Sequence, residues 1–182
     1  PAEARDVFLY PGWQQETLVM GSNHPFRGRK AQLYEGGIRT PAFVRWHGVL
    51  PADRRLNTPL HMVDWLPTLA GLAGASPGGD AELDGTDIWP ILSGRTVTTE
   101  ERTLYWNLRH KRFAVRRGDW KLISRETEEG TRNELYNIAC DPGETLDLAD
   151  QHPQQVSDML DLIADQHSRD DAAVRPDMQR SD

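Results

Sequence analysis

Apolar residues recur along the chain with two different periods, and each period predicts its own kind of element. In the first half, apolar positions spaced i, i+3, i+4 and i+7 predict a helix over Leu60–Gly74. Asp64 is expected to cap its start, and Gly74 is typical of the residue that follows a helix. The predicted apolar face consists of Leu66, Leu69, Ala70 and Ala73.

From about Arg102 onwards, short alternating or continuous apolar runs predict strands. The predicted strands are Thr103–Trp106, Arg112–Arg116, Trp120–Ser124 and Glu134–Ile138. A tight turn is expected at Arg117-Gly118-Asp119, so the segment predicts a small antiparallel sheet. A helix is predicted to start at His152-Pro153, because Val156, Met159, Leu160 and Ile163 again have helical spacing. This helix is expected to cover one face of the sheet.

Two further strands and one boundary are predicted from shorter signals. Ile38–Trp46 has β-branched and aromatic residues after the Gly36-Gly37 pair, which favours a buried strand with Pro41 near its edge or start. Val7–Tyr10 is a candidate short strand. Ala75–Asp80 is rich in Gly and Pro, which predicts a division into domains 1–80 and 81–182.

Composition and charge narrow the class of protein. The chain has 182 residues, of which 37% are hydrophobic and 27% charged, as in globular domains, and no run is long enough to predict a membrane span. A net charge of −7 argues against a nucleic-acid partner. The single cysteine, Cys140, excludes an internal disulfide and a cysteine-based zinc cluster, and it is expected to be small and buried.

Against this acidic background, one stretch is basic. Gly21–Arg55 holds seven Lys or Arg residues and two acidic residues, with glycines between them. Backbone N–H groups near glycine and charge-assisted hydrogen bonds from cations suit such a loop to hold an anion. The alternative, a solvated loop ahead of a core strand, stays open on composition alone. The candidate residues are Lys30, His24 and Arg27.

An ordered series of short motifs resembles the C-terminal part of a sulfatase of the arylsulfatase B-like group, within the alkaline-phosphatase-like superfamily. The motifs are Pro25–Lys30 (PFRGRK), Glu35–Pro41 (EGGIRTP), Asp64–Leu69 (DWLPTL), Leu83–Gly85 (LDG), Ala114–Leu122 (AVRRGDWKL), Glu134–Asn137 (ELYN) and Asp141–Glu144 (DPGE). The resemblance implies an α/β fold. The chain would hold the tail of a catalytic α/β domain and a small C-terminal antiparallel sheet packed by a helix.

The resemblance also implies hydrolysis of sulfate esters. In that family a Cys or Ser in a Cys/Ser-x-Pro-x-Arg motif becomes formylglycine, carboxylates hold calcium, and a lysine binds the sulfate. Lys30 matches that lysine, whereas His24 and Arg27 are candidates for substrate binding. Cys140–Glu144 has Glu144 where the motif requires Arg, so formylglycine and the calcium ligands are expected upstream and no metal ligand is assigned here. The chain alone is therefore expected to be inactive.

Two other functions stay open at this stage. The chain could be a truncated, non-catalytic relative that binds sulfated ligands or a partner chain, or part of a related phosphatase or phosphonate hydrolase. The expected ligand is a sulfated small molecule or glycan whose identity the sequence leaves open. If the parent follows the family, it would be secreted, periplasmic or lysosomal.

Overall fold

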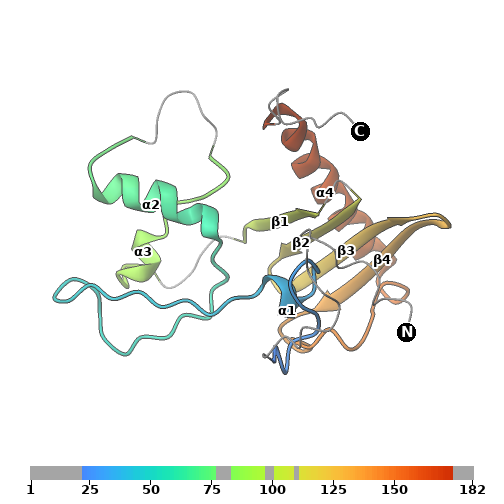
Figure 1. Cartoon of the computed structure of the whole chain (residues 1–182), viewed down its shortest axis with the longest axis horizontal. Coiled ribbons are helices and arrows are strands. Elements are labelled where there is room, and N and C mark those ends of the chain that lie inside the picture. The colour runs from blue at the N-terminus through green and yellow to red at the C-terminus, as the bar shows by residue number, and fades with distance from the viewer. Residues whose placement is uncertain (1–21, 77–82, 97–100, 109–110, 174–182) are drawn as a thin grey trace, which may run out of the picture. The chain divides into compact units, whose positions relative to one another are not determined.

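The computed structural model describes residues 22–76, 83–96, 101–108 and 111–173, so the strand predicted at Val7–Tyr10 lies outside it. The chain divides into two compact units: unit 1 comprises residues 1–40 and 105–182, and unit 2 comprises residues 41–104. The helices are α1 (Glu35–Ile38), the 3-10 helix η2 (Met62–Asp64), α2 (Trp65–Leu72), α3 (Trp89–Leu92) and α4 (Pro153–Ala173). The strands are β1 (Thr103–Leu108), β2 (Arg112–Arg117), β3 (Trp120–Thr127) and β4 (Gly130–Asn137) (Figure 1). No helix among the described residues is long and apolar enough to cross a membrane.

The four strands form one sheet in the order β1-β2-β3-β4, which confirms the predicted small sheet. The β2–β3 and β3–β4 pairs are antiparallel, and Arg117 lies opposite Trp120 across the predicted turn. Gly118 in that turn has a φ of 57°, a left-handed conformation that glycine adopts without steric cost. β2, β3 and β4 therefore join through short turns, and the order of the four strands in the sheet follows their order in the chain.

The helix α4 covers one face of this sheet, as the apolar spacing predicted (Figure 1). Met159 and Ile163 of α4 pack with Phe113, Leu122 and Leu135 of the strands in one buried cluster. Full burial of an apolar side chain of this size contributes about 1.5–3 kcal/mol to folding. This cluster is therefore a main source of stability for unit 1.

The opposite face of the sheet is covered by the N-terminal basic segment, which the sequence did not predict. Leu33 and Tyr34 of that segment are buried in one cluster with Ala114, Ile123 and Tyr136 of the strands. Because side chains alternate along a strand, β3 sends Leu122 toward α4 and Ile123 toward this segment. The sheet is thus enclosed by two segments that are far apart in the sequence.

Unit 2 has a small apolar core and a buried carboxylate. Ile88 is buried with other apolar residues around α3. The Asp64 side chain, expected to cap the helix, instead accepts hydrogen bonds from the backbone N–H of His61 (2.6 Å) and of Thr86 (3.1 Å), and from Arg102 (2.8 Å). Asp64 therefore fixes the turn η2 before α2 and joins it to two later segments, while Gly74 follows α2 with a φ of 69° as predicted.

The strand predicted over Ile38–Trp46 is wrong. Ile38 ends α1, and residues 39–46 have no regular secondary structure and are exposed, with Phe43 98% accessible. A strand exists only when a neighbour supplies hydrogen bonds, and no described strand pairs with this segment. The prediction from strand propensity alone therefore wrongly assigned this segment to a buried core.

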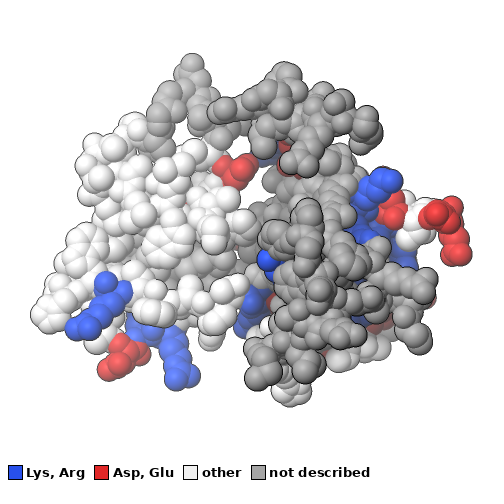
Figure 2. Space-filling model, in the orientation of Figure 1, with Lys and Arg blue, Asp and Glu red and all other residues white. Residues whose placement is uncertain are grey.

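The predicted helix is present as η2 and α2, but its apolar face is not buried. Leu66 and Leu69 are 58% and 56% accessible, whereas Thr68 and the half-buried Trp65 turn toward the rest of unit 2. Figure 2 shows a broad uncharged surface over the region of α2 and α3. Periodicity identified the apolar face of this helix, but it did not show whether another element covers it.

Part of the predicted boundary at Ala75–Asp80 lies outside the described residues. The division into domains 1–80 and 81–182 stays a prediction.

Candidate functional site

The candidate site is the basic loop, residues 27–37, which lies against the sheet face opposite α4. The loop is wound closely on itself. A Cβ on Gly36 would lie 2.5 Å from the carbonyl oxygen of Arg27, and one on Gly37 would lie 2.6 Å from that of Arg29. The Gly36 N–H also donates to the Arg27 carbonyl at 2.7 Å. The two glycines are therefore required for this close approach, and the loop behaves as one compact piece.

The predicted site residues differ in their exposure and in the contacts that they make. Lys30 lies at the exposed turn of the basic loop, next to Ala31, whose φ of 67° turns the chain sharply. His24 is exposed in the preceding turn. Arg27 is anchored: its guanidinium lies 4.0 Å from the centre of the Tyr34 ring and donates to the Tyr136 hydroxyl at 3.0 Å. Roles for these three residues in substrate binding stay predictions.

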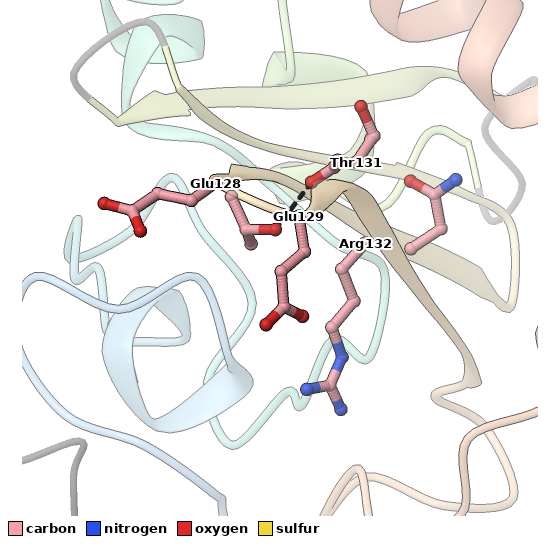
Figure 3. A pocket seen from close by; sticks show the side chains of 7 residues that line it. Glu128, Glu129, Thr131 and Arg132 are labelled. Carbon is pink, nitrogen blue, oxygen red and sulfur yellow. Dashed lines mark hydrogen bonds between the residues drawn. The ribbon is translucent and has the colours of Figure 1, made fainter.

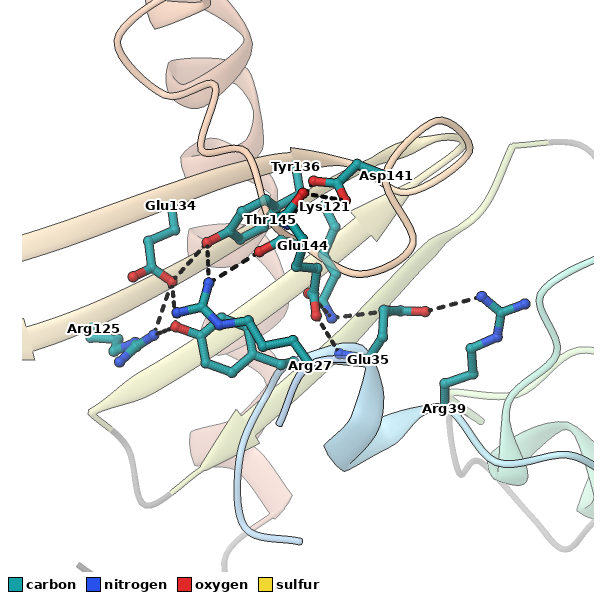
Figure 4. Close-up of polar contacts among 11 residues, drawn as sticks. Arg27, Glu35, Arg39, Lys121, Arg125, Glu134, Tyr136, Asp141, Glu144 and Thr145 are labelled. Atoms are coloured by element: carbon teal, nitrogen blue, oxygen red, sulfur yellow. Dashed lines mark hydrogen bonds and ion pairs between the residues drawn. The ribbon is translucent and has the colours of Figure 1, made fainter. Parts of the chain in front are cut away.

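A buried ion cluster, which the sequence reasoning missed, joins the basic loop to the sheet. Lys121 of β3 is fully buried and donates to Glu35 Oε1 at 2.9 Å and to Glu144 Oε1 at 2.8 Å. The second oxygen of Glu144, Oε2, accepts the backbone N–H of Glu35 at 2.6 Å. Figure 4 shows these three side chains converging between the loop, the strand and the turn after β4. We call Glu35, Lys121 and Glu144 the buried triad.

Glu144 reaches the triad because of an unusual turn. Asp141 accepts hydrogen bonds from the N–H groups of Thr145 (2.7 Å) and Leu146 (2.9 Å), which closes the turn after β4. Burial raises the pKa of Asp141, but these hydrogen bonds outweigh it and hold that pKa below its ordinary value. Glu144 then adopts a φ of 54° and points inward. Cys140, expected to be buried, is exposed, because its side chain lies in the turn beyond the end of the strand.

A second polar cluster attaches Tyr34, the residue before Glu35, to the sheet. The Tyr34 hydroxyl donates to Glu134 Oε2 at 2.7 Å, and Arg125 donates to the same carboxylate at 2.9 Å and contacts the Tyr34 hydroxyl. Burial, with the hydrogen bond to Glu134, raises the pKa of Tyr34 to about 12. Burial and the charge of Glu134 also raise the pKa of Tyr136. Both phenols are therefore neutral hydrogen-bonding groups near pH 7 and serve to attach the loop to the sheet.

The pKa of Glu144 gives a testable pH dependence. Burial raises this pKa above its ordinary value of 4.5, and attraction and hydrogen bonding from Lys121 and the Glu35 N–H offset the shift only in part. Charged groups nearby are Lys121, Glu35, Arg39 beside Glu35, and Arg116 of β2. A raised carboxyl pKa means that the folded state holds the proton more tightly than the unfolded state, so stability from Glu144 is lost as pH rises through that pKa.

We therefore expect the stability difference between wild type and Glu144→Gln to shift in favour of the variant as pH rises from about 4 to about 7. Urea unfolding at a series of pH values measures this difference. A difference that stays constant, or that moves in favour of wild type, would contradict the assignment.

The surface of unit 1 has an open depression. The depression lies at the β3–β4 turn, where Glu128, Glu129, Thr131 and Arg132 surround it (Figure 3). It is exposed and formed only by the turn itself, so it offers no enclosed site. Among the residues that the structure describes, no three His, Cys, Asp or Glu side chains gather to hold a metal ion, so these residues do not fit the calcium that the resemblance implies.

Comparison with known proteins decides the family. The model of the N-sulphoglucosamine sulphohydrolase C-terminal family matches residues 24–169. The chain belongs to this sulfatase family. The match includes the basic loop, the sheet, the turn carrying Glu144 and most of α4.

Individual sulfatases agree with this membership. The chain is 34% identical over 158 residues to a sulfatase of Formosa agariphila, covering 78% of this chain and 28% of that protein. It is 30% identical over 143 residues to N-acetylgalactosamine-6-sulfatase of Canis lupus familiaris, covering 79% of this chain and 27% of that protein. The crystal structure of Ps i-CgsB resembles it with a TM-score of 0.70 at 28% identity, covering 79% of this chain and 32% of that one. The chain therefore spans about a third or less of the length of these sulfatases, and its neighbours confirm the predicted alkaline-phosphatase-like, sulfatase-type α/β fold.

Proposed function

We propose that this chain acts as the C-terminal part of a sulfatase and supplies Lys30 to the hydrolysis of a sulfate ester. The observation that carries the proposal is the family match over residues 24–169, which includes the basic loop with Lys30 at its exposed turn. The loop is held to the sheet before its bend by Arg27 and after its bend by Tyr34 and Glu35. Such fixation supports a role in which Lys30 must meet a ligand in a defined place.

The chemistry of Lys30 follows from its charge. Negative charge builds up on the sulfate oxygens and the leaving oxygen as the S–O bond breaks, and a positioned ammonium group stabilises that charge. Formylglycine would supply the nucleophile and calcium would stabilise the bound sulfate in sulfatases that carry them. The described residues of this chain offer the cation and its support, and we expect the 182-residue chain alone to be inactive.

The substrate class is a sulfated small molecule or glycan. Ps i-CgsB, a structural neighbour with a TM-score of 0.70, was solved in complex with k-i-k-neocarrahexaose. That complex supports a carbohydrate ligand for the present protein. His24, exposed six positions before Lys30, and Arg27 remain candidates for contacts with such a ligand.

Exposed apolar surface in unit 2 supports a role for this chain as part of a longer polypeptide. Phe43 and the Leu66–Leu69 face of α2 belong to unit 2 and lie uncovered in this structure. Surfaces of this kind mark places where another protein segment packs. We propose that the remainder of a sulfatase catalytic domain covers them.

The direct test compares the native polypeptide, purified from its source, with the isolated 182-residue chain. Both are incubated with a chromogenic aryl sulfate and with sulfated carrageenan oligosaccharides, and released sulfate is measured by ion chromatography. The proposal predicts sulfate release by the native polypeptide and none by the isolated chain. Sulfate release by the isolated chain would contradict it, as would release of phosphate from a phosphate ester with no sulfatase activity.

A non-catalytic binding protein is the second candidate, favoured by the net positive charge of Gly21–Arg55. It predicts that the native polypeptide is retained on an immobilised sulfated glycan without releasing sulfate, and that Lys30→Ala abolishes retention.

A further inference from the structure

The buried triad lies in a position to control the basic loop. Glu35 belongs to that loop, Lys121 to β3 and Glu144 to the turn after β4, so three segments far apart in sequence meet at one point (Figure 4). Lys121 and Glu144 are fully buried and Glu35 is 3% exposed. Ionic contacts excluded from water in this way are strong and geometrically demanding.

Movement of Glu35 would carry the whole basic loop with it. The residues after Glu35 are the two glycines packed against the carbonyl groups of Arg27 and Arg29, which lie three positions and one position before Lys30. The Arg39 N–H donates to the Glu35 carbonyl at 2.7 Å, so the residue that follows α1 is also hydrogen-bonded to Glu35. The loop therefore has little internal freedom to absorb a displacement at Glu35.

We propose that the buried triad is a positioning element, in which Glu144 and Lys121 hold Glu35 and thereby set the place of Lys30. The inference rests on the proposed function of Lys30, and it assigns to the turn after β4 a role in that function. None of the three triad residues needs to touch the substrate. Their effect passes through the backbone of the basic loop.

The hydrogen-bond inventory of Glu144 makes the proposal specific. Both carboxylate oxygens face buried donors, the Lys121 ammonium and the Glu35 N–H. A glutamine has one acceptor oxygen for these two donors and must turn its own NH2 donor toward one of them. Glu144 accepts from both donors at once, which its amide replacement cannot do.

Glu35→Gln is a matched control, because it also removes one negative charge from the buried triad. Its Oε1 faces buried Lys121, but its Oε2 faces Arg39, 3.6 Å away and half exposed. In Glu35→Gln the amide group can point toward Arg39, which is able to move into solvent. We therefore expect Glu35→Gln to disturb the loop much less than Glu144→Gln does.

The test uses the native polypeptide carrying Glu144→Gln, Glu35→Gln or, as an exposed-lysine control, Lys111→Met. Hydrogen–deuterium exchange of the peptide covering residues 33–38 is measured alongside that of β3, and kcat and KM for an aryl sulfate are measured separately. For Glu144→Gln we expect faster exchange in residues 33–38 with β3 unchanged, and a loss of roughly 10- to 100-fold in kcat/KM, the range seen for supporting residues around functional groups. In Glu144→Gln the loss should fall mainly on kcat, as expected for Lys30→Ala, because the group that is displaced is Lys30.

Several results would overturn the proposal. These are unchanged loop exchange in Glu144→Gln, equal effects of Glu144→Gln and Glu35→Gln, or unfolding of β3 together with the loop, which would make the triad a general core contact. Failure of the proposed function gives a different pattern, because Lys30→Ala would then leave sulfate release unchanged whatever the exchange data show.

Discussion

Replacing Lys121 with methionine is expected to lower the free energy of unfolding of unit 1 by about 3–5 kcal/mol, because it leaves buried Glu144 without its cation and Glu35 with only the half-exposed Arg39. Lys121 pairs with Glu35 at 2.9 Å and with Glu144 at 2.8 Å. Methionine has a similar length, so the effect measures charge rather than a cavity. Urea unfolding of the 182-residue chain, followed by circular dichroism, measures the change near pH 7.

The same experiment has an internal check in its pH dependence. Protonation relieves the repulsion between unpaired carboxyl groups, so the Lys121→Met chain should recover part of its stability as pH falls toward about 4. Lys111→Met, at an exposed position, should stay within about 0.5 kcal/mol of wild type. A loss below about 1 kcal/mol for Lys121→Met would show that the triad contributes little to the attachment of the basic loop.

Replacing Lys30 with alanine is expected to reduce kcat for a sulfate ester by roughly 100- to 1000-fold in the native polypeptide, because one positioned donor at the developing charge is lost. Lys30 is exposed, so folding should be nearly unaffected. Lys30→Arg keeps the charge but changes its shape and is expected to give intermediate rates.

Lys111→Ala is the matched control for this prediction, since Lys111 is also an exposed lysine of unit 1. Steady-state rates with an aryl sulfate, together with thermal melts of each variant, separate catalytic loss from unfolding. Equal rates for wild type and Lys30→Ala would exclude the catalytic role proposed for Lys30.

Local patterns in the sequence predicted the parts of the fold that neighbouring residues determine. The strands β2 and β3 and the turn at Gly118 follow from alternation and one glycine, and α4 follows from the spacing of Met159 and Ile163. These elements are built from residues close together in the chain, and the apolar face of each is buried within unit 1.

Contacts between distant segments could not be predicted in the same way. The basic loop has no hydrophobic period, and its hydrogen bond from Tyr34 to Glu134 spans 100 positions. One signal was present: Lys121 lies within the apolar run Trp120–Ile123, and strand alternation places it on the same face as buried Ile123. A lysine at such a position needs a buried carboxylate partner, which would have directed attention to Glu35 and Glu144.

The error at Ile38–Trp46 has a related cause. Strand propensity describes a residue that fits a half-buried pleated surface, and the segment has this composition. Whether it pairs depends on a neighbouring strand, which the described residues do not supply. Lys30, Glu35 and Glu144 all lie in motifs of the resemblance, but the motifs did not show that Glu35 and Glu144 meet at Lys121.

The intact mass of the native polypeptide tests whether this chain is part of a longer sulfatase. An antibody raised against the sheet of unit 1 would isolate the protein from its source, and mass spectrometry would give its mass. The account predicts a mass well above 20.6 kDa, because a sulfatase needs the nucleophile that we expect upstream. A mass of 20.6 kDa would contradict the account and would favour the non-catalytic binding protein.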